Sequence, residues 1–134
     1  MTIEKALQMI LPEPQQNGPG GIVFDLCFPA DFPAFSGHFP DEKILPAVVQ
    51  VMSIKMMMEK VTRATLCVRA VSKARFKNPV LPDQTLRISC IPVHQDETVL
   101  VSVKITDMGT IEKSRFELAC TTTNHSKRPI NQRL

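Results

Sequence analysis

Alternation of apolar and polar residues is the clearest pattern in the chain. Between Gly21 and Phe28 every second residue is apolar, which is the period of a strand with one buried face. The same period returns after residue 65 and is most regular between Val99 and Ile105. The later part of the chain therefore predicts four further strands joined by short turns: Leu66–Phe76, Gln84–Val93, Thr98–Thr106 and Thr110–Thr122.

A different pattern fills the middle of the chain and predicts its main helix. Pro46 suits the first helical position, because its missing N–H would have no helical partner there, and no other helix breaker follows before Thr65. The first three turns carry apolar residues around almost the whole circumference, which predicts a helix buried on all sides. A short helix capped by Thr2 is predicted at the start, ending near Leu11 before Pro12.

Prolines exclude regular structure between the first strand and the main helix, so residues 29–45 are expected to form a long loop. The loop is aromatic, since five of the seven phenylalanines of the chain lie in or just before it: Phe24, Phe28, Phe32, Phe35 and Phe39. One buried helix between a first strand and a run of antiparallel strands predicts an α+β fold in which a curved sheet encloses the helix. That arrangement is the hotdog fold, expected here as a single domain over residues 1–124 with a polar, basic tail over 125–134.

Composition and charge exclude several classes of protein. The chain has 134 residues, of which 43% are hydrophobic, and a net charge of +3, too small to favour a nucleic-acid ligand. No two of the four cysteines have the close spacing of a metal or redox site, so each is expected to be a buried apolar residue. The N-terminus does not have the pattern of a signal peptide, and polar residues interrupt the apolar stretch from Ile44 to Val61. These features predict a cytoplasmic protein that does not span a membrane.

Two separated motifs carry a family resemblance. The first, residues 35–50, reads FSGHFPDEKILPAVVQ, and the second, residues 74–84, reads ARFKNPVLPDQ. Both are similar to signatures of the FabA/FabZ-type 3-hydroxyacyl-acyl carrier protein dehydratases, including the ApeI-like branch found with aryl-polyene-type synthesis genes. Six residues match the first signature: Gly37, His38, Phe39, Pro40, Pro46 and Val48.

The resemblance implies a reaction and a set of site residues. A 3-hydroxyacyl thioester loses water when a base removes a proton at C2 and an acid protonates the C3 hydroxyl. The resemblance gives the role of base to His38, whose side-chain type titrates near neutral pH. The backbone N–H groups of Ala47 and Val48, at the start of the helix, are expected to polarise the thioester carbonyl. Neither a metal nor another cofactor is implied.

At the position of the family's acid the chain carries Met52, which cannot donate a proton. Glu59 lies on nearly the same helix face but about 10 Å further along the axis. Three loop acids, Asp31, Asp41 and Glu42, could approach the site instead, although loop carboxylates are usually only solvated. The sequence therefore leaves the proton donor open.

The resemblance also implies partners. The substrate would be an acyl thioester on acyl carrier protein, and the assembly a homodimer with its site at the interface. Arg75 and Lys77 are expected either to receive the carrier protein or to form an ordinary solvated strand face. An acyl tunnel would be lined by apolar residues of the loop, the helix and the second motif: Phe35, Phe39, Met52, Met56 and Phe76.

Two functions stay open on these residues, and a third has less support. The first is a dehydratase-like hydro-lyase of fatty-acid or polyene-type synthesis that uses His38. The second is a catalytically degenerate module that binds an acyl chain or carrier protein, or that serves as the partner subunit of an active dehydratase. A hotdog thioesterase would need a polar group in register with the thioester, and none is found.

Overall fold

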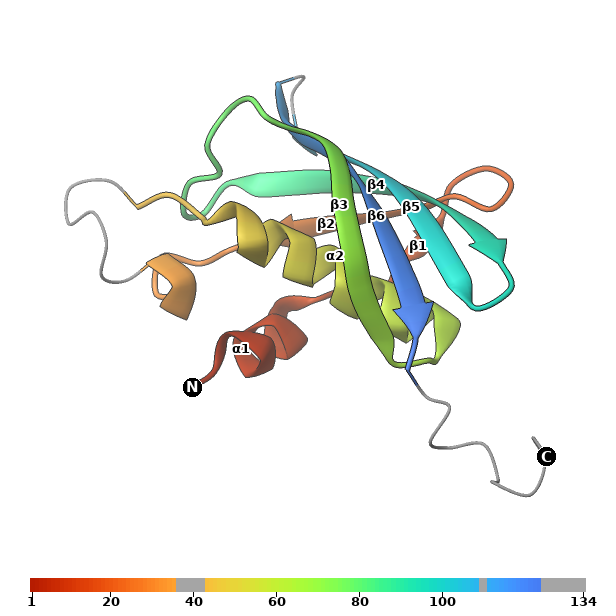
Figure 1. Cartoon of the computed structure of the whole chain (residues 1–134). Helices are drawn as coiled ribbons and strands as arrows, with labels where there is room; N and C mark the ends of the chain where they lie inside the picture. The colour runs from red at the N-terminus through yellow and green to blue at the C-terminus, as the bar shows by residue number, and fades with distance from the viewer. Residues whose placement is uncertain (36–42, 109–110, 124–134) are drawn as a thin grey trace.

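The structure, a computed structural model, describes residues 1–35, 43–108 and 111–123. A six-stranded antiparallel sheet with the strand order β1-β2-β4-β5-β6-β3 forms one layer, and helix α2 lies against it (Figure 1). The elements in chain order are α1 (Ile3–Ile10), β1 (Gln15–Gln16), β2 (Ile22–Cys27), the 3-10 helix η1 (Pro33–Phe35), α2 (Ala47–Thr62), β3 (Leu66–Phe76), β4 (Thr85–Gln95), β5 (Thr98–Asp107) and β6 (Glu112–Thr122).

The core lies between α2 and the face of the sheet that the alternating apolar residues cover. In β5, Val101 and Val103 are almost fully buried, whereas Leu100 and Lys104 on the opposite face are exposed. The helix supplies Ile54, Met57 and Met58 to the same core. The predicted α+β arrangement is therefore present, with the two-residue strand β1 as an element that the alternation was too short to predict.

Local sequence signals predicted the starts of both helices to within one residue. Thr2 caps α1 by accepting a hydrogen bond from the backbone N–H of Lys5 at 3.1 Å. Helix α2 begins at Ala47, with Pro46 as its N-cap, which is one residue later than predicted. It ends where Arg63 turns into the left-handed region, with φ 57°.

The prediction that the main helix is buried on all sides was wrong. Val48 is 63% exposed, and Val51, Met52 and Met56 are half-buried. The sheet covers one side of α2 and the two-turn helix α1 contacts only part of another, so the described residues cannot enclose the whole circumference. One apolar side of α2 is therefore left partly uncovered by the described residues.

The expectation that all four cysteines are buried holds for only two of them. Cys90 and Cys120 lie in the core, Cys67 is half-buried, and Cys27 is exposed; all four are free thiols. Burial raises the pKa of the Cys90 thiol to about 12. Cys27 follows the buried Leu26 in a strand of period two, so its side chain points to the uncovered face of the sheet.

Candidate active site

Three phenylalanines in edge-to-face contact hold the segment that leads into the first motif. Phe28 and Phe32 meet edge to face with ring centroids 5.0 Å apart, and Phe32 meets Phe35 at 6.4 Å. All three are at least 94% buried. Backbone bonds from Phe32 to Pro29, at 2.9 Å, and from Phe35 to Phe32, at 3.0 Å, close the turns between them. The chain is thus fixed in place up to Phe35.

The histidine motif itself, with Gly37, His38, Phe39 and Pro40, lies outside the described residues, as do Asp41 and Glu42. Phe35 and Lys43, the described residues on either side of it, both line a cavity of about 280 Å³. The exposed Asp31 lines the same cavity. The roles of His38 and Phe39 remain predictions.

The first turn of α2 offers the backbone donors expected there. The N–H of Leu45 bonds to the carbonyl of Val80 at 2.9 Å, which ties the entry of the helix to the β3–β4 connection. The N–H of Val49 is already bonded to the Pro46 carbonyl at 3.0 Å. Among the described residues, the N–H groups of Ala47 and Val48 have no acceptor, as is usual at the start of a helix.

The residues expected to line a tunnel lie on three elements. Met52 and Met56, one turn apart on α2, pack against the edge of the core. Phe76 lies on β3, 43% exposed, with its ring stacked on that of Phe116 at 5.8 Å. Phe35 instead belongs to the aromatic cluster near η1, so the described residues do not bring it together with Phe76.

The sequence did not predict a buried polar pair that joins the first turn of α2 to the start of β6. Ser114, fully buried, donates its hydroxyl to Oε1 of Gln50 at 2.5 Å. Ser53 is also buried and bonds back to the carbonyl of Val49 at 2.8 Å. Gln50 and Ser53 interrupt an apolar stretch of the sequence, and only the tertiary structure shows that Gln50 is satisfied by Ser114 from a distant strand.

Lys113 is a second residue that the sequence did not single out. Ser114 pairs with Ile105 and Glu112 with Thr106, so Lys113 is the extra residue of a β-bulge. It is only 6% exposed, and no carboxylate of the described residues lies within ion-pair distance. Only the α2 side of the sheet is covered by another described layer, so this burial indicates that the lysine points to that side.

The chain matches a known protein family over the region that contains these residues. Residues 13–116 match the ApeI-like family, described as ApeI dehydratase. The chain belongs to the ApeI-like dehydratase family. The match spans most of the chain and includes both motifs, α2 and the sheet as far as Phe116.

Among curated proteins, similar ones are FabZ dehydratases. The 3-hydroxyacyl-[acyl-carrier-protein] dehydratase FabZ of Solibacter usitatus is 26% identical over 106 residues, covering 72% of this chain and 65% of the relative. That of Rhodospirillum rubrum is 35% identical over 65 residues, covering 42% of this chain and 41% of the relative. The chain thus spans less than two thirds of the length of these relatives.

Solved structures with the same architecture confirm the hotdog fold. The dehydratase heterocomplex ApeI:P from Xenorhabdus doucetiae superposes with a TM-score of 0.70 at 17% identity, covering 81% of this chain and 93% of the other. The PaaI protein of E. coli, from the phenylacetic acid degradation operon, gives a TM-score of 0.63 at 14% identity, covering 89% and 88%. At these identities the likeness concerns the fold.

In this ApeI-like chain the two basic residues of the second motif have different surroundings. Lys77 pairs with Glu112 at 3.0 Å, and Arg115 pairs with the same carboxylate at 2.6 Å. Hydrogen bonds from Arg115 and Lys77 lower the pKa of Glu112 to about 2. Arg75 is exposed, and no described residue pairs with it. Of the two, only Lys77 is paired with a carboxylate of the described residues, whereas the charge of Arg75 has no partner among them.

The lowered pKa of Glu112 predicts a pH-dependent contribution to stability. Because the folded pKa lies below the ordinary value of 4.5, the stabilisation is complete above about pH 4.5 and is lost as the pH falls toward 2. We expect Glu112→Gln to lower the free energy of unfolding at pH 7, and the difference from wild type to shrink over that range in urea titrations. Glu117→Gln, whose carboxylate is 42% exposed and 3.6 Å from Lys73, should have a smaller effect. A constant difference from pH 7 to pH 2 would contradict the prediction.

Glu59, the acid of helix α2 that was weighed as a proton donor, has a structural role. Glu59 accepts a hydrogen bond from the backbone N–H of Leu66 at 2.9 Å and pairs with Lys55 at 3.2 Å. Its carboxylate therefore ties the end of α2 to the start of β3. It lies two turns beyond Met52, in agreement with its exclusion as the donor.

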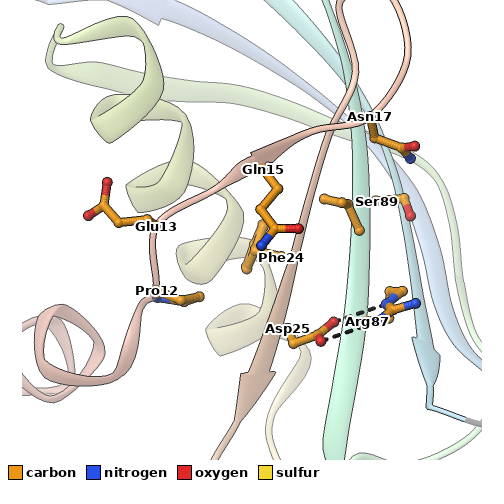
Figure 2. Close-up of a pocket in the computed structure, with 9 residues that line it drawn as sticks. Pro12, Glu13, Gln15, Asn17, Phe24, Asp25, Arg87 and Ser89 are labelled. Atoms are coloured by element: carbon orange, nitrogen blue, oxygen red, sulfur yellow. Dashed lines mark hydrogen bonds and ion pairs between the residues drawn. The ribbon is translucent and has the colours of Figure 1, made fainter.

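A larger cavity, of about 390 Å³, lies at the other edge of the sheet, between the α1–β1 connection and strands β2 and β4. Figure 2 shows Asp25 and Arg87 pointing toward each other within it, joined by two bonds of 3.0 and 3.2 Å. These two charges compensate each other. The cavity contains none of the residues predicted for the site and is separate from the first turn of α2.

Two features are absent from the described residues. No helix in residues 1–35, 43–108 and 111–123 is long and apolar enough to cross a membrane. Within the same ranges no three His, Cys, Asp or Glu side chains form a group that could hold a metal ion. His94, one of the histidines without a motif, is exposed on β4.

Proposed function

We propose that the chain is a 3-hydroxyacyl-thioester dehydratase-like protein of fatty-acid or polyene-type synthesis, acting in the cytoplasm on acyl chains bound to acyl carrier protein. The observation that carries the proposal is the membership of the ApeI-like dehydratase family across the histidine motif and α2. The FabZ relatives, which the chain covers only in part, act on acyl carrier protein substrates by name.

His38 is the proposed base. It would remove a proton from C2 of the thioester, so that negative charge develops on the carbonyl oxygen. The N–H groups of Ala47 and Val48, which have no acceptor within the described part of the chain, are the proposed donors to that oxygen, and such donors lower the energy of the charged transition state. The hydroxyl at C3 then leaves as water once it receives a proton. Met52 cannot supply that proton.

An apolar path for the acyl chain is proposed along α2. Met52 and Met56 border the core on the side of the helix that the sheet leaves open, and Phe76 is partly exposed on the neighbouring β3. Phe35 and Phe39 would line the path where the histidine motif meets the aromatic cluster. Flexible methionines accept acyl chains of different shape.

The carrier protein is proposed to approach β3. Acyl carrier proteins bring an acidic surface and a phosphate, and Arg75, next to Phe76, is a cation that no carboxylate of the described residues compensates. Lys77 is partly neutralised by Glu112, so its contribution would be smaller. The site is proposed to be completed by a second subunit, in the simplest case another copy of this chain as a homodimer.

The second candidate function is binding of the acyl chain or carrier protein without dehydration. In it the chain is a catalytically degenerate acyl or carrier-protein-binding module, or the partner of an active dehydratase that supplies the carboxylate. The methionine at position 52 favours it, because the acid is missing from the helix that borders the site.

A single assay separates the two candidates. The purified chain is incubated with a 3-hydroxyacyl carrier-protein thioester, and enoyl product and complex formation are both measured. Product above the buffer control supports the enzyme, whereas binding without product supports the module. If neither product nor binding appears, both forms of the proposal fail. Lys104 is exposed on β5, on the face of the sheet opposite the core, and Lys104→Ala provides a matched surface control with unchanged behaviour.

A further inference from the structure

Among the described residues, Lys113 is the only charged side chain that is buried. It is 6% exposed, in the bulge of β6, and its ammonium forms neither an ion pair nor a hydrogen bond with the described part of the chain. A lysine that only covers apolar surface keeps its ammonium in water. Burying that group without a partner is costly, so lysines are seldom buried in this way. The burial therefore indicates a ligand outside the described chain.

The carboxylates next to Lys113 in the sheet have other partners. Glu112, the preceding residue, pairs with Lys77 at 3.0 Å and with Arg115 at 2.6 Å. Arg115 is exposed on the face of the sheet opposite α2, so this pair places the Glu112 carboxylate on that face as well. Asp107, at the end of β5, accepts a backbone N–H of the β5–β6 connection at 3.0 Å. Within the described ranges neither carboxylate pairs with Lys113.

Strand β6 begins beside the start of α2. Ser114 donates its hydroxyl to Gln50, in the first turn of the helix, at 2.5 Å. The other end of β6 pairs with Leu66, whose backbone N–H bonds to Glu59 near the end of the helix. The strand and the helix therefore run in the same general direction. Lys113, one residue before Ser114, lies toward the N-terminal end of α2.

The connection between β3 and β4 links the same two places. The backbone N–H groups of Lys77 and Asn78 bond to the carbonyl of Lys113 at 2.9 and 3.2 Å. Two residues further on, the carbonyl of Val80 accepts the N–H of Leu45 at 2.9 Å, and in Figure 1 this connection reaches the start of the helix. Val80 and Leu45 are both buried. Lys113 therefore lies at the end of the core where α2 begins.

The start of α2 is a second feature that favours an anion. The N–H groups of Ala47 and Val48 have no acceptor among the described residues, and the first turn of this 16-residue helix carries a partial positive charge. A buried ammonium beside such donors favours a negatively charged oxygen. Met52 lies about 200° around the helix from Gln50, so Lys113 does not replace the missing acid.

We propose that Lys113 and the first turn of α2 hold the thioester carbonyl oxygen of the acyl substrate as that oxygen becomes negatively charged. When a base takes the proton from C2, the electron pair of the C2–H bond forms the double bond of an enolate, and the carbonyl electron pair moves to the oxygen. Lys113 donates a hydrogen bond to this oxygen and keeps its proton. The identity of the substrate rests on the proposed function, whereas the burial of Lys113 does not.

The test uses a saturated acyl thioester on acyl carrier protein, which has no C3 hydroxyl and cannot lose water. Infrared difference spectroscopy measures the stretching frequency of its isotope-labelled carbonyl in the complex, which a hydrogen bond from a cation lowers. Mass spectrometry measures exchange of the C2 hydrogens in deuterated water. In Lys113→Met, which keeps the size and removes the charge, we expect the frequency to rise and the exchange to slow by about 10²- to 10³-fold. Lys113→Arg, which keeps the charge, should lose less of both.

A stability measurement separates this role from a structural one. Lys113→Met removes a buried charge without a partner, so its urea midpoint should be higher than that of wild type. A lysine that only supports the fold would give a lower midpoint. Lys104→Met, exposed on the opposite face of the sheet, is the matched control and should leave frequency, exchange and midpoint unchanged.

The outcomes distinguish this inference from the proposed function. Unchanged carbonyl frequency and exchange in a Lys113→Met variant that still binds the thioester would overturn the inference, while dehydration of a 3-hydroxyacyl thioester by the same variant would leave the proposed function intact. If wild type binds no acyl thioester, the proposed function fails and this inference fails with it. In a chain that binds without turnover, the carbonyl frequency alone decides. If Lys113→Met does not fold, which circular dichroism shows, the inference is wrong about the cost of the buried charge.

Discussion

Replacing Met52 with Glu is expected to raise the rate of dehydration of a 3-hydroxyacyl carrier-protein thioester by about 10²- to 10⁴-fold. That range is the usual contribution of one positioned general acid. Met52 is half-buried on the open side of α2, so a carboxyl group fits there without burying a charge in the core. Partial burial also favours the protonated form, which is the form that donates. The measurement is enoyl product per unit time.

The gain should depend on the base. In the double variant His38→Ala/Met52→Glu we expect the gained activity to disappear, because proton removal at C2 and proton donation at C3 belong to one reaction. Met52→Gln is the matched control, since it has similar size and polarity but cannot donate a catalytic proton. Circular dichroism should show the same fold for all three.

Each outcome bears on a different part of the proposal. If wild type turns over as fast as Met52→Glu, another donor acts and the missing acid is not limiting. If the gain survives His38→Ala, the assignment of the base is wrong. If Met52→Gln gains as much as Met52→Glu, polarity rather than proton donation explains the effect.

Truncating the aromatic cluster is expected to have the largest effect on stability. Phe28 is 1% exposed and meets Phe32 at 5.0 Å, so Phe28→Ala should lower the free energy of unfolding by about 3–5 kcal/mol, through lost burial and an unfilled cavity. The loss would also release the residues that lead into the histidine motif. Urea titration followed by circular dichroism measures the change.

Phe76→Ala provides the comparison within the same residue type. Phe76 is 43% exposed, so its truncation removes less buried surface and leaves no closed cavity. We expect a loss well below that of Phe28→Ala. Equal losses for the two variants would show that the cluster near η1 is not a more important part of the core than the edge of β3.

Elements with a strong local period could be predicted from the sequence. The bounds predicted for β3, Leu66–Phe76, agree with the structure, and the start of α2 is displaced by a single residue. Strand β4 ends two residues later than predicted, because nothing in its sequence marks the point where pairing with β5 stops. Alternation and proline positions act through neighbouring residues, which is why they can be read without the fold.

Properties that depend on distant residues could not be predicted. The apolar residues around α2 predicted full burial, but exposure depends on what covers each side, and Val48 is exposed. The burial of Lys113 comes from a bulge in β6, whose pairing with β5 the sequence does not reveal. The ring of Phe76 is partly exposed because β3 is the last strand of the sheet, and this position also depends on pairing between distant segments.

The sequence by itself determined the family-bearing motifs, the order of helix and strands, and the absence of an acid at position 52, because these are properties of residues and their spacing. Only the tertiary structure decided which apolar residues stay uncovered and which cations are compensated. Arg75 lies on β3 and Lys77 directly after the strand, two residues further on, yet among the described carboxylates Glu112 of β6 reaches only Lys77. Burial and charge pairing arise between segments far apart in the chain, so they exist only once the sheet has formed around α2.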